Sequence, residues 1–245
     1  MTVTDAGPQE LLPVASAAMP TMPARNTPRL LEPGVLREEI GLASSTPTLP
    51  GHKGKLWLYL PQGQHEPKSL PCVLIAPAGT PLVTGMDLAL RDVPEHLPYV
   101  KAGFAVLSYE LDGVCEDLEN ASNDQVSRAI SAFRNAHAGL INARVALEFI
   151  LAKVPEVDPN QIYSAGHSSA ATLSLLFAEH EPRLKACVAY APVVDVPRRL
   201  GAARLGMLSV VSPGVREFVA RSSPKAHEQH FACPVFLFHA LDDSN

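Results

Sequence analysis

Short runs of apolar residues alternate with longer amphipathic stretches from about residue 55 to the end of the chain. Apolar runs bounded by turn residues are typical of strands in a sheet that is covered on both faces. Strands that alternate with helices predict a doubly wound, mostly parallel α/β sheet flanked by helices, with right-handed crossovers. The expected strands are residues 56–60, 71–76, 104–109, 161–165, 184–190 and 234–239.

Helical spacing of apolar residues occurs in three segments between these strands. A helix is expected over residues 93–102, although Pro98 interrupts the pattern. Residues 121–154 carry the longest helical pattern, and Gly139 predicts a break within it. A third helix is expected to follow Ser168 and to end near residue 180.

The first 50 residues are rich in proline, serine, threonine and alanine, which predicts an extended or disordered leader. Within it, residues 35–42 alternate between apolar and polar side chains and predict an edge strand, with Leu36 and Ile40 on one face. Glu38 interrupts that apolar face.

The remaining residues, 51–245, are expected to form one domain, because a chain of this length can build a single α/β core. Residues 196–231 place several arginines among leucine, methionine and valine. This segment is either a small helical cap over a site or a set of helices that joins two strands.

The sequence Gly-His-Ser-Ser-Ala at residues 166–170 lies between an expected strand and an expected helix. Small residues two positions before and after a serine permit a sharp, strained turn that aims the hydroxyl outward. Gly166 and Ala170 fill these positions, the second with alanine where glycine is commoner. We therefore expect Ser168 to be a nucleophile; the alternative is an ordinary serine-rich helix start.

Acyl transfer also needs hydrogen-bond donors for the oxyanion. The backbone N–H of Ser169, at the start of the helix, is expected to face the developing negative charge. Gly79 and Thr80 follow an earlier strand and are expected to supply a second backbone donor, because glycine lets the chain approach a substrate closely. An ordinary turn between a strand and a helix fits the same two residues.

The expected catalytic acid is Asp242, which follows the last strand; its neighbour Asp243 and the earlier Asp195 are alternatives. Each of these carboxylates also fits a role in capping a turn. None of the nine histidines follows Asp242. His167 lies inside the motif, where its side chain is expected to point away from the Ser168 hydroxyl. No histidine is assigned as the base.

Two further histidines, His227 and His230, precede the last strand and are expected at the surface. The four cysteines form no CxxC pair, so they are expected to be reduced thiols in or beside strands, with no metal site.

A net charge of −5 and the absence of a cluster of basic residues argue against nucleic acid as a partner. No apolar run is long enough to span a membrane, and the N-terminus lacks the basic flank of a signal peptide. A cytoplasmic protein that acts on small molecules or peptides is expected.

Two further stretches extend the pattern around the serine motif. They are Val-Leu-Ser-Tyr at 106–109 followed by Asp112-Gly113, and Ser223-Pro224 ahead of Pro-Val-Phe-Leu-Phe-His-Ala-Leu-Asp-Asp at 234–243. With these motifs, residues 54–245 resemble the α/β-hydrolase superfamily, in particular serine hydrolases of the prolyl oligopeptidase and dienelactone hydrolase group. Ala240 stands where that group usually has glycine, and Pro-Ala-Gly at 77–79 replaces its His-Gly-Gly loop.

The resemblance implies an acyl-enzyme on Ser168, without a cofactor or metal. It also implies one more helix, strand and loop that would carry a histidine roughly thirty residues beyond Asp242. The sequence is therefore expected to be truncated after the acid, with the last strand and helix of the α/β-hydrolase fold missing. Without the base, the 245-residue chain is expected to be nearly inactive.

The expected function is cleavage of carboxylic ester or peptide bonds, with a small ester or short peptide as substrate because no β-propeller-like region restricts access. The alternative is a non-catalytic hydrolase-like fragment or binding module, which the missing histidine favours. Neither a nucleic acid nor a membrane is expected as a partner, and the oligomeric state is left open.

Overall fold

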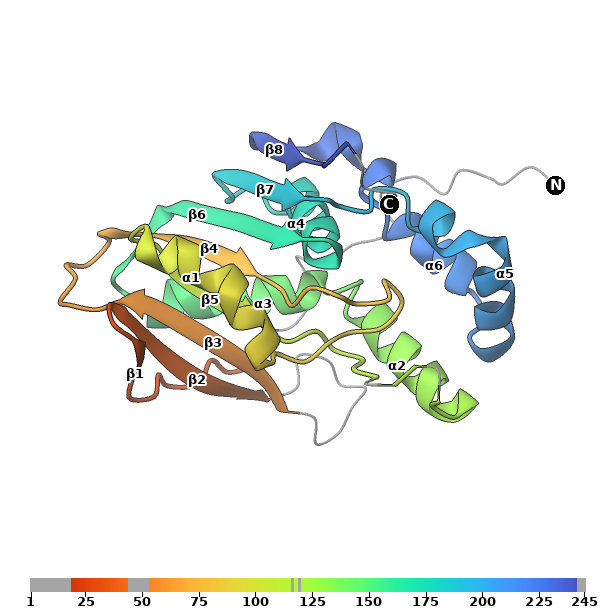
Figure 1. The fold of residues 1–245 in the computed structure, drawn as a ribbon, viewed down its shortest axis with the longest axis horizontal. Helices are drawn as coiled ribbons and strands as arrows, with labels where there is room; N and C mark the ends of the chain where they lie inside the picture. Colours follow the sequence, from red (N-terminus) through yellow and green to blue (C-terminus); the bar gives the residue numbers. More distant parts are fainter. Residues whose placement is uncertain (1–18, 44–52, 116, 119, 242–245) are drawn as a thin grey trace.

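The fold is centred on one twisted sheet (Figure 1). The structure is a computed structural model that describes residues 19–43, 53–115, 117–118 and 120–241. Its eight strands have the order β1-β2-β3-β5-β4-β6-β7-β8. The strands from β5 to β8 in this order run parallel, and β1, β2 and β3 pair antiparallel. The mostly parallel α/β sheet predicted from the sequence is therefore confirmed. The strands are β1 (Arg29–Glu32), β2 (Val35–Ala43), β3 (Lys53–Pro61), β4 (Leu70–Ile75), β5 (Ala105–Tyr109), β6 (Val157–His167), β7 (Ala186–Tyr190) and β8 (Val235–Phe238).

Helices flank the sheet on both faces, with α1 on one face and α3 and α4 on the other (Figure 1). The predicted break is confirmed, because Gly139, with a φ of 90°, separates α2 from α3. A capping box starts α2, in which the Ser122 hydroxyl accepts from the Gln125 N–H and the Gln125 side chain accepts from the Ser122 N–H. The helices are α1 (Val93–Lys101), α2 (Asn123–Asn135), α3 (Leu140–Lys153), α4 (Ser169–His180), α5 (Val196–Val211) and α6 (Val215–Arg221), with 3₁₀ turns η3 (Leu90–Asp92), η4 (Pro224–Ala226) and η5 (Glu228–His230).

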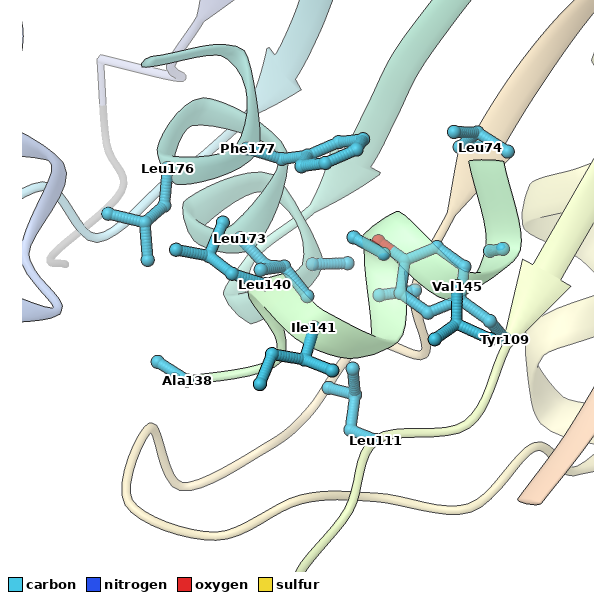
Figure 2. Packing of buried hydrophobic residues seen from close by; sticks show 14 of the residues in the cluster. Leu74, Tyr109, Leu111, Ala138, Leu140, Ile141, Val145, Leu173, Leu176 and Phe177 are labelled. Carbon is cyan, nitrogen blue, oxygen red and sulfur yellow. The ribbon is translucent and has the colours of Figure 1, made fainter. Parts of the chain in front are cut away.

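The larger hydrophobic core lies between the sheet and helices α3 and α4. Figure 2 shows Phe177 and Leu173 of α4 beside Leu140 of α3, with Leu74 of β4 nearby. All of these side chains are buried. Burial of such apolar side chains contributes about 1.5–3 kcal/mol each. This packing holds α4, which begins at Ser169, against the central strands.

The sheet begins earlier in the chain than the expected boundary at residue 51. Strands β1 and β2 both come from the segment assigned to the leader, and β2 pairs along its length with β3. Because β1 pairs with the other side of β2, the prediction that residues 35–42 form an edge strand is wrong. The strand itself is confirmed, with Ile40 buried against the larger core.

Glu38, which interrupts the apolar face of β2, is buried beside Arg25. The Arg25 Nε donates to one carboxylate oxygen of Glu38 at 3.1 Å, and its Nη1 donates to Glu156 at 2.9 Å. A buried carboxylate is costly unless it is paired and hydrogen-bonded. Arg25 therefore makes the inward position of Glu38 tolerable, and it ties the N-terminal segment to the turn before β6.

Removal of this cation tests the role of Arg25 in stability. We expect Arg25→Ala to lower the free energy of unfolding by about 3 kcal/mol, because Glu38 would remain buried without a partner. Urea denaturation measures the change. The matched control is Arg91→Ala, which breaks the exposed Arg91–Asp87 pair and should cost less than about 1 kcal/mol. An equal, small effect in both variants would contradict this account.

Residues 196–231 form α5, α6 and two 3₁₀ turns. Helices α5 and α6 lie beyond the carboxyl ends of the strands (Figure 1), and the turns η4 and η5 contact α4. Phe218 of α6 packs edge-on against Phe133 of α2, with ring centroids 6.0 Å apart. Gly201, with a φ of 75°, interrupts α5 near its start. Of the helices in the described ranges, none combines the length and the apolar character needed to span a membrane.

The end of α4 buries titratable groups that the sheet and η5 enclose. Both carboxylate oxygens of Glu179 are buried without a hydrogen-bond partner among the described residues, and burial raises the pKa of Glu179 to about 9. Burial also lowers the pKa of His180 to about 4. His227 packs against His180 with ring centroids 4.8 Å apart. The prediction that His227 lies at the surface is wrong, whereas His230 is exposed.

The raised pKa of Glu179 predicts a fall in stability with rising pH. The folded state holds a proton that the unfolded state releases above its ordinary pKa of 4.5, so the stability from Glu179 is lost as pH rises toward about 9. The opposite contribution of His180 is complete above pH 6.5. We expect Glu179→Gln to flatten the decline in unfolding free energy between pH 7 and 9, measured by urea denaturation. Glu217→Gln, at an exposed position of α6, should leave the decline unchanged. A wild-type decline that persists in Glu179→Gln would refute this assignment.

Candidate active site

Ser168 lies on the turn that joins β6 to α4. Its φ and ψ are 55° and −121°, a conformation that L-residues other than glycine rarely adopt. Such strain persists only where the surrounding structure holds it, and it is common at functional sites. The strand, turn and helix around Ser168 are the structural context that a nucleophile elbow requires.

Gly166 permits the close approach of β6 and α4. A Cβ atom at this position would lie 2.4 Å from the carbonyl carbon of Ala170 and 2.6 Å from its oxygen. These are backbone atoms, which cannot move aside without shifting the helix. Ala170 is itself buried. The small residues on both sides of Ser168 are therefore required by the packing.

Hydrogen bonds hold the turn from the β7 side. The Ser168 N–H donates to the carbonyl of Tyr190 at 2.8 Å, and the Thr172 N–H donates to the carbonyl of Ser168 at 3.0 Å. The Thr172 hydroxyl also accepts from the Val193 N–H at 2.9 Å. The first turn of α4 thus fixes the loop that follows β7.

The loop after β4 reaches the turn from the other side. The N–H groups of Gly79 and Thr80 both donate to the Ser169 hydroxyl oxygen, each at 2.9 Å. Gly79 has a φ of 99°, which glycine tolerates and other residues do not. The sequence predicted that these N–H groups would face the substrate directly. In the structure they meet the side chain of Ser169 instead, and the Ser169 hydroxyl is buried beside them.

Of the three candidate acids, Asp195 is the one that the structure describes. Asp242 and Asp243 lie outside the described residues. Asp195 caps α5, because its carboxylate accepts from the Arg198 N–H at 3.1 Å, and it pairs with Lys225 at 3.2 Å. The hydrogen bond from the Arg198 N–H lowers the pKa of Asp195. Asp195 therefore has a structural role in the segment after β7.

His167 points toward α1. Its Nδ1 lies 3.4 Å from a carboxylate oxygen of Glu95, and the ring is largely exposed. Burial raises the pKa of Glu95, which the neighbouring His167 opposes. The rings of His65, His96, His180 and His227 form hydrogen bonds with groups other than Ser168.

A cavity of about 750 Å³ lies on the α1 side of the sheet, next to β6 and β7. Its lining includes Glu95, Tyr99, His167, Tyr190 and Phe238, but Ser168 does not line it. Within the described ranges, no group of histidine, cysteine, aspartate or glutamate side chains is arranged to hold a metal ion.

The roles of the Ser169 and Thr172 side chains were not predicted from the sequence. Both are hydroxyl residues in the first turn of the helix after Ser168, a position visible in the sequence. Their partners are Gly79, Thr80 and Val193, which belong to other loops, so only the folded structure reveals the contacts.

The comparisons with known proteins identify the fold. No protein-family model matches the chain, and no curated protein sequence matches it. An acetyl xylan esterase from Paenibacillus sp. R4 has a similar structure, with a TM-score of 0.63 and 15% identity over 89% of this chain and 82% of the esterase. Acetyl xylan esterase 1 from Thermoanaerobacterium sp. JW/SL YS485 has a TM-score of 0.61 at 15% identity, over 90% of this chain and 72% of that one.

A third similar structure is an acylaminoacyl peptidase in complex with Z-Gly-Gly-Phe-chloromethyl ketone. Its TM-score is 0.62 at 16% identity, over 86% of this chain and 32% of the peptidase. The chain has the fold shared by these esterases and peptidases, the α/β-hydrolase fold, as the sequence predicted. At these identities the likeness establishes the fold.

The close contact at Gly166 generates a prediction. We expect Gly166→Ala to lower the free energy of unfolding by about 2 kcal/mol or more, because the added methyl would meet the backbone of Ala170. Thermal or urea denaturation measures the loss. The control is Gly41→Ala in β2, where an added Cβ meets no atom within 4 Å and the change should stay within about 0.5 kcal/mol. Equal stability of the two variants would show that α4 tolerates the added atom.

Proposed function

We propose that the protein is a serine hydrolase and that Ser168 is its nucleophile. The observation that carries the proposal is the strained backbone of Ser168 at the junction of β6 and α4. A serine held in this conformation presents its hydroxyl beyond the end of the sheet, next to the first N–H groups of a helix. The similar esterases and peptidases support hydrolysis as the class of reaction.

In the proposed reaction, the Ser168 oxygen attacks the carbonyl carbon while a general base removes the hydroxyl proton. The carbonyl oxygen gains negative charge, which the Ser169 N–H and the positive end of the α4 dipole stabilise. The tetrahedral intermediate expels the alcohol or amine, which takes up the proton from the base. Water then attacks the acyl-enzyme and releases the acid. Asp242 remains the proposed acid that would orient the base.

We propose a small carboxylic ester as the preferred substrate, with a short peptide as the second choice. The chain spans 82% and 72% of the two acetyl xylan esterases but 32% of the peptidase. The described residues form one α/β-hydrolase domain, and this supports a small substrate. We also propose that α5 and α6 form a cap beside the site, since they lie at the carboxyl ends of the strands (Figure 1).

The second candidate function is a non-catalytic module that binds a ligand with this fold. The observation that favours it is that the rings of His65, His96, His180 and His227 bond to groups other than Ser168, and that His167 faces Glu95. The two functions differ in one property, the reactivity of the Ser168 hydroxyl, so a covalent probe separates them.

A fluorophosphonate probe tests the enzyme proposal on the full-length gene product, in which a general base can activate the serine. We expect intact mass and peptide mapping to show one phosphonyl group on Ser168, because the elbow and the Ser169 N–H stabilise attack at phosphorus as they do at carbon. The Ser168→Ala variant and the unfolded chain should both stay unlabelled. A folded wild type that is never labelled would leave the binding module as the better description.

Turnover should be slow in the 245-residue chain itself. No histidine follows Asp242 in the 245 residues, so we expect hydrolysis of p-nitrophenyl acetate to remain close to that of Ser168→Ala. A rate typical of esterases would mean that another group in this chain serves as the base. A peptidyl p-nitroanilide, assayed in parallel, should be cleaved more slowly than the ester.

A further inference from the structure

The Ser169 hydroxyl accepts two hydrogen bonds at the point where a second oxyanion donor is expected. The backbone N–H groups of Gly79 and Thr80 both donate to it at 2.9 Å. A serine hydroxyl has two acceptor positions and one O–H donor. Both acceptor positions are therefore filled, and the hydroxyl can act toward any further group only as a donor.

The O–H of Ser169 has no acceptor among the residues that the structure describes. Ser169 as a whole is 5% exposed, so bulk water does not surround its hydroxyl. A buried donor that is left unused costs free energy, so its retention needs a reason. Ser169 directly follows Ser168 in the chain, at the first position of α4.

We propose that the Ser169 hydroxyl is the second oxyanion donor. In this relay, its oxygen accepts hydrogen bonds from the backbone N–H groups of Gly79 and Thr80, and its O–H donates to the negative oxygen of the substrate. Hydrogen bonds in a chain polarise one another, so two N–H groups that donate to the oxygen make its O–H a stronger donor. The backbone N–H and the side-chain O–H of one residue then serve the same negative oxygen. This inference rests on the proposed function, because it assigns a role in the attack by Ser168.

The same contacts make Ser169 the anchor of the loop after β4. Gly79 is exposed and has a φ of 99°. Among the described residues, the Ser169 hydroxyl oxygen is the acceptor for the Gly79 N–H. A void of about 20 Å³ borders Ser169, with Thr80 and Thr172 among its lining residues. An added methyl group on the Ser169 side chain therefore has space beside it.

The alternative is that the hydroxyl blocks the two N–H groups, which would otherwise reach the oxyanion themselves. The two arrangements predict opposite effects on the reaction rate of Ser168 when the Ser169 hydroxyl is removed. In the relay, loss of the hydroxyl removes a donor from the site. In the blocking arrangement, its loss frees two donors and speeds the reaction.

The experiment measures the rate at which a fluorophosphonate labels Ser168 in the full-length gene product. The Ser168 oxygen forms a bond to phosphorus, fluoride leaves, the serine proton passes to solvent, and the phosphoryl oxygen carries the growing charge. We expect Ser169→Ala to be labelled roughly ten- to a hundredfold more slowly than wild type, since an oxyanion donor is lost. Ser169→Thr keeps the hydroxyl and should stay within about threefold of wild type. The control Ser174→Ala, a buried serine further along α4, should label at the wild-type rate.

Amide hydrogen exchange supplies a readout that does not depend on reactivity. In Ser169→Ala, the amides of Gly79 and Thr80 should exchange faster than in wild type. In the control Ser174→Ala, the same two amides should exchange at the wild-type rate. Labelling of Ser169→Ala at the wild-type rate or faster would overturn the relay. So would equal slowing in the Ala and Thr variants, or slower labelling with no change in exchange at Gly79 and Thr80. If wild type is not labelled at all, the proposed function fails, which is a different result.

Discussion

The approach of α4 to β6 is the contact on which the site depends. A Cβ atom at residue 166 would lie 2.4 Å from the carbonyl carbon of Ala170, so the backbone of α4 packs directly against Gly166. The chain therefore turns sharply between Gly166 and Ala170. The turn forces Ser168 into a strained conformation, and the core around Phe177 holds the helix that imposes it. The strain is thus stabilised by burial of apolar surface at some distance from the serine.

Hydroxyl groups in the first turn of α4 join the three loops at this edge of the sheet. Ser169 binds the loop after β4, Thr172 binds the loop after β7, and both belong to the helix that follows β6. A helix start offers backbone N–H groups without intrahelical partners, and side-chain oxygens nearby add acceptors. The first turn of α4 therefore holds the loops after β4 and β7 in place around Ser168.

The sequence predicted the features that depend on local pattern. The parallel strands, the helices on both sides of Gly139 and the turn at Ser168 each follow from residues close together in the chain. The edge assignment of β2 failed because β1 lies in a proline-rich stretch with little strand pattern. The environment of Glu38 depends on Arg25, and the partners of Ser169 lie 89 and 90 positions away, so neither follows from a local pattern. His227 is buried because η5 folds back on the end of α4.

The ion pair between Arg25 and Glu156 also bears on the order in which the molecule assembles. The two residues are 131 positions apart, and contacts of such separation form late because closing a long loop costs entropy. On the ribosome, the N-terminal segment reaches its final place only after residue 156 of 245 has been added. Glu38 can meet Arg25 much earlier, across 13 positions. The N-terminal segment therefore makes its final contact with the turn before β6 only after more than half of the chain has been made.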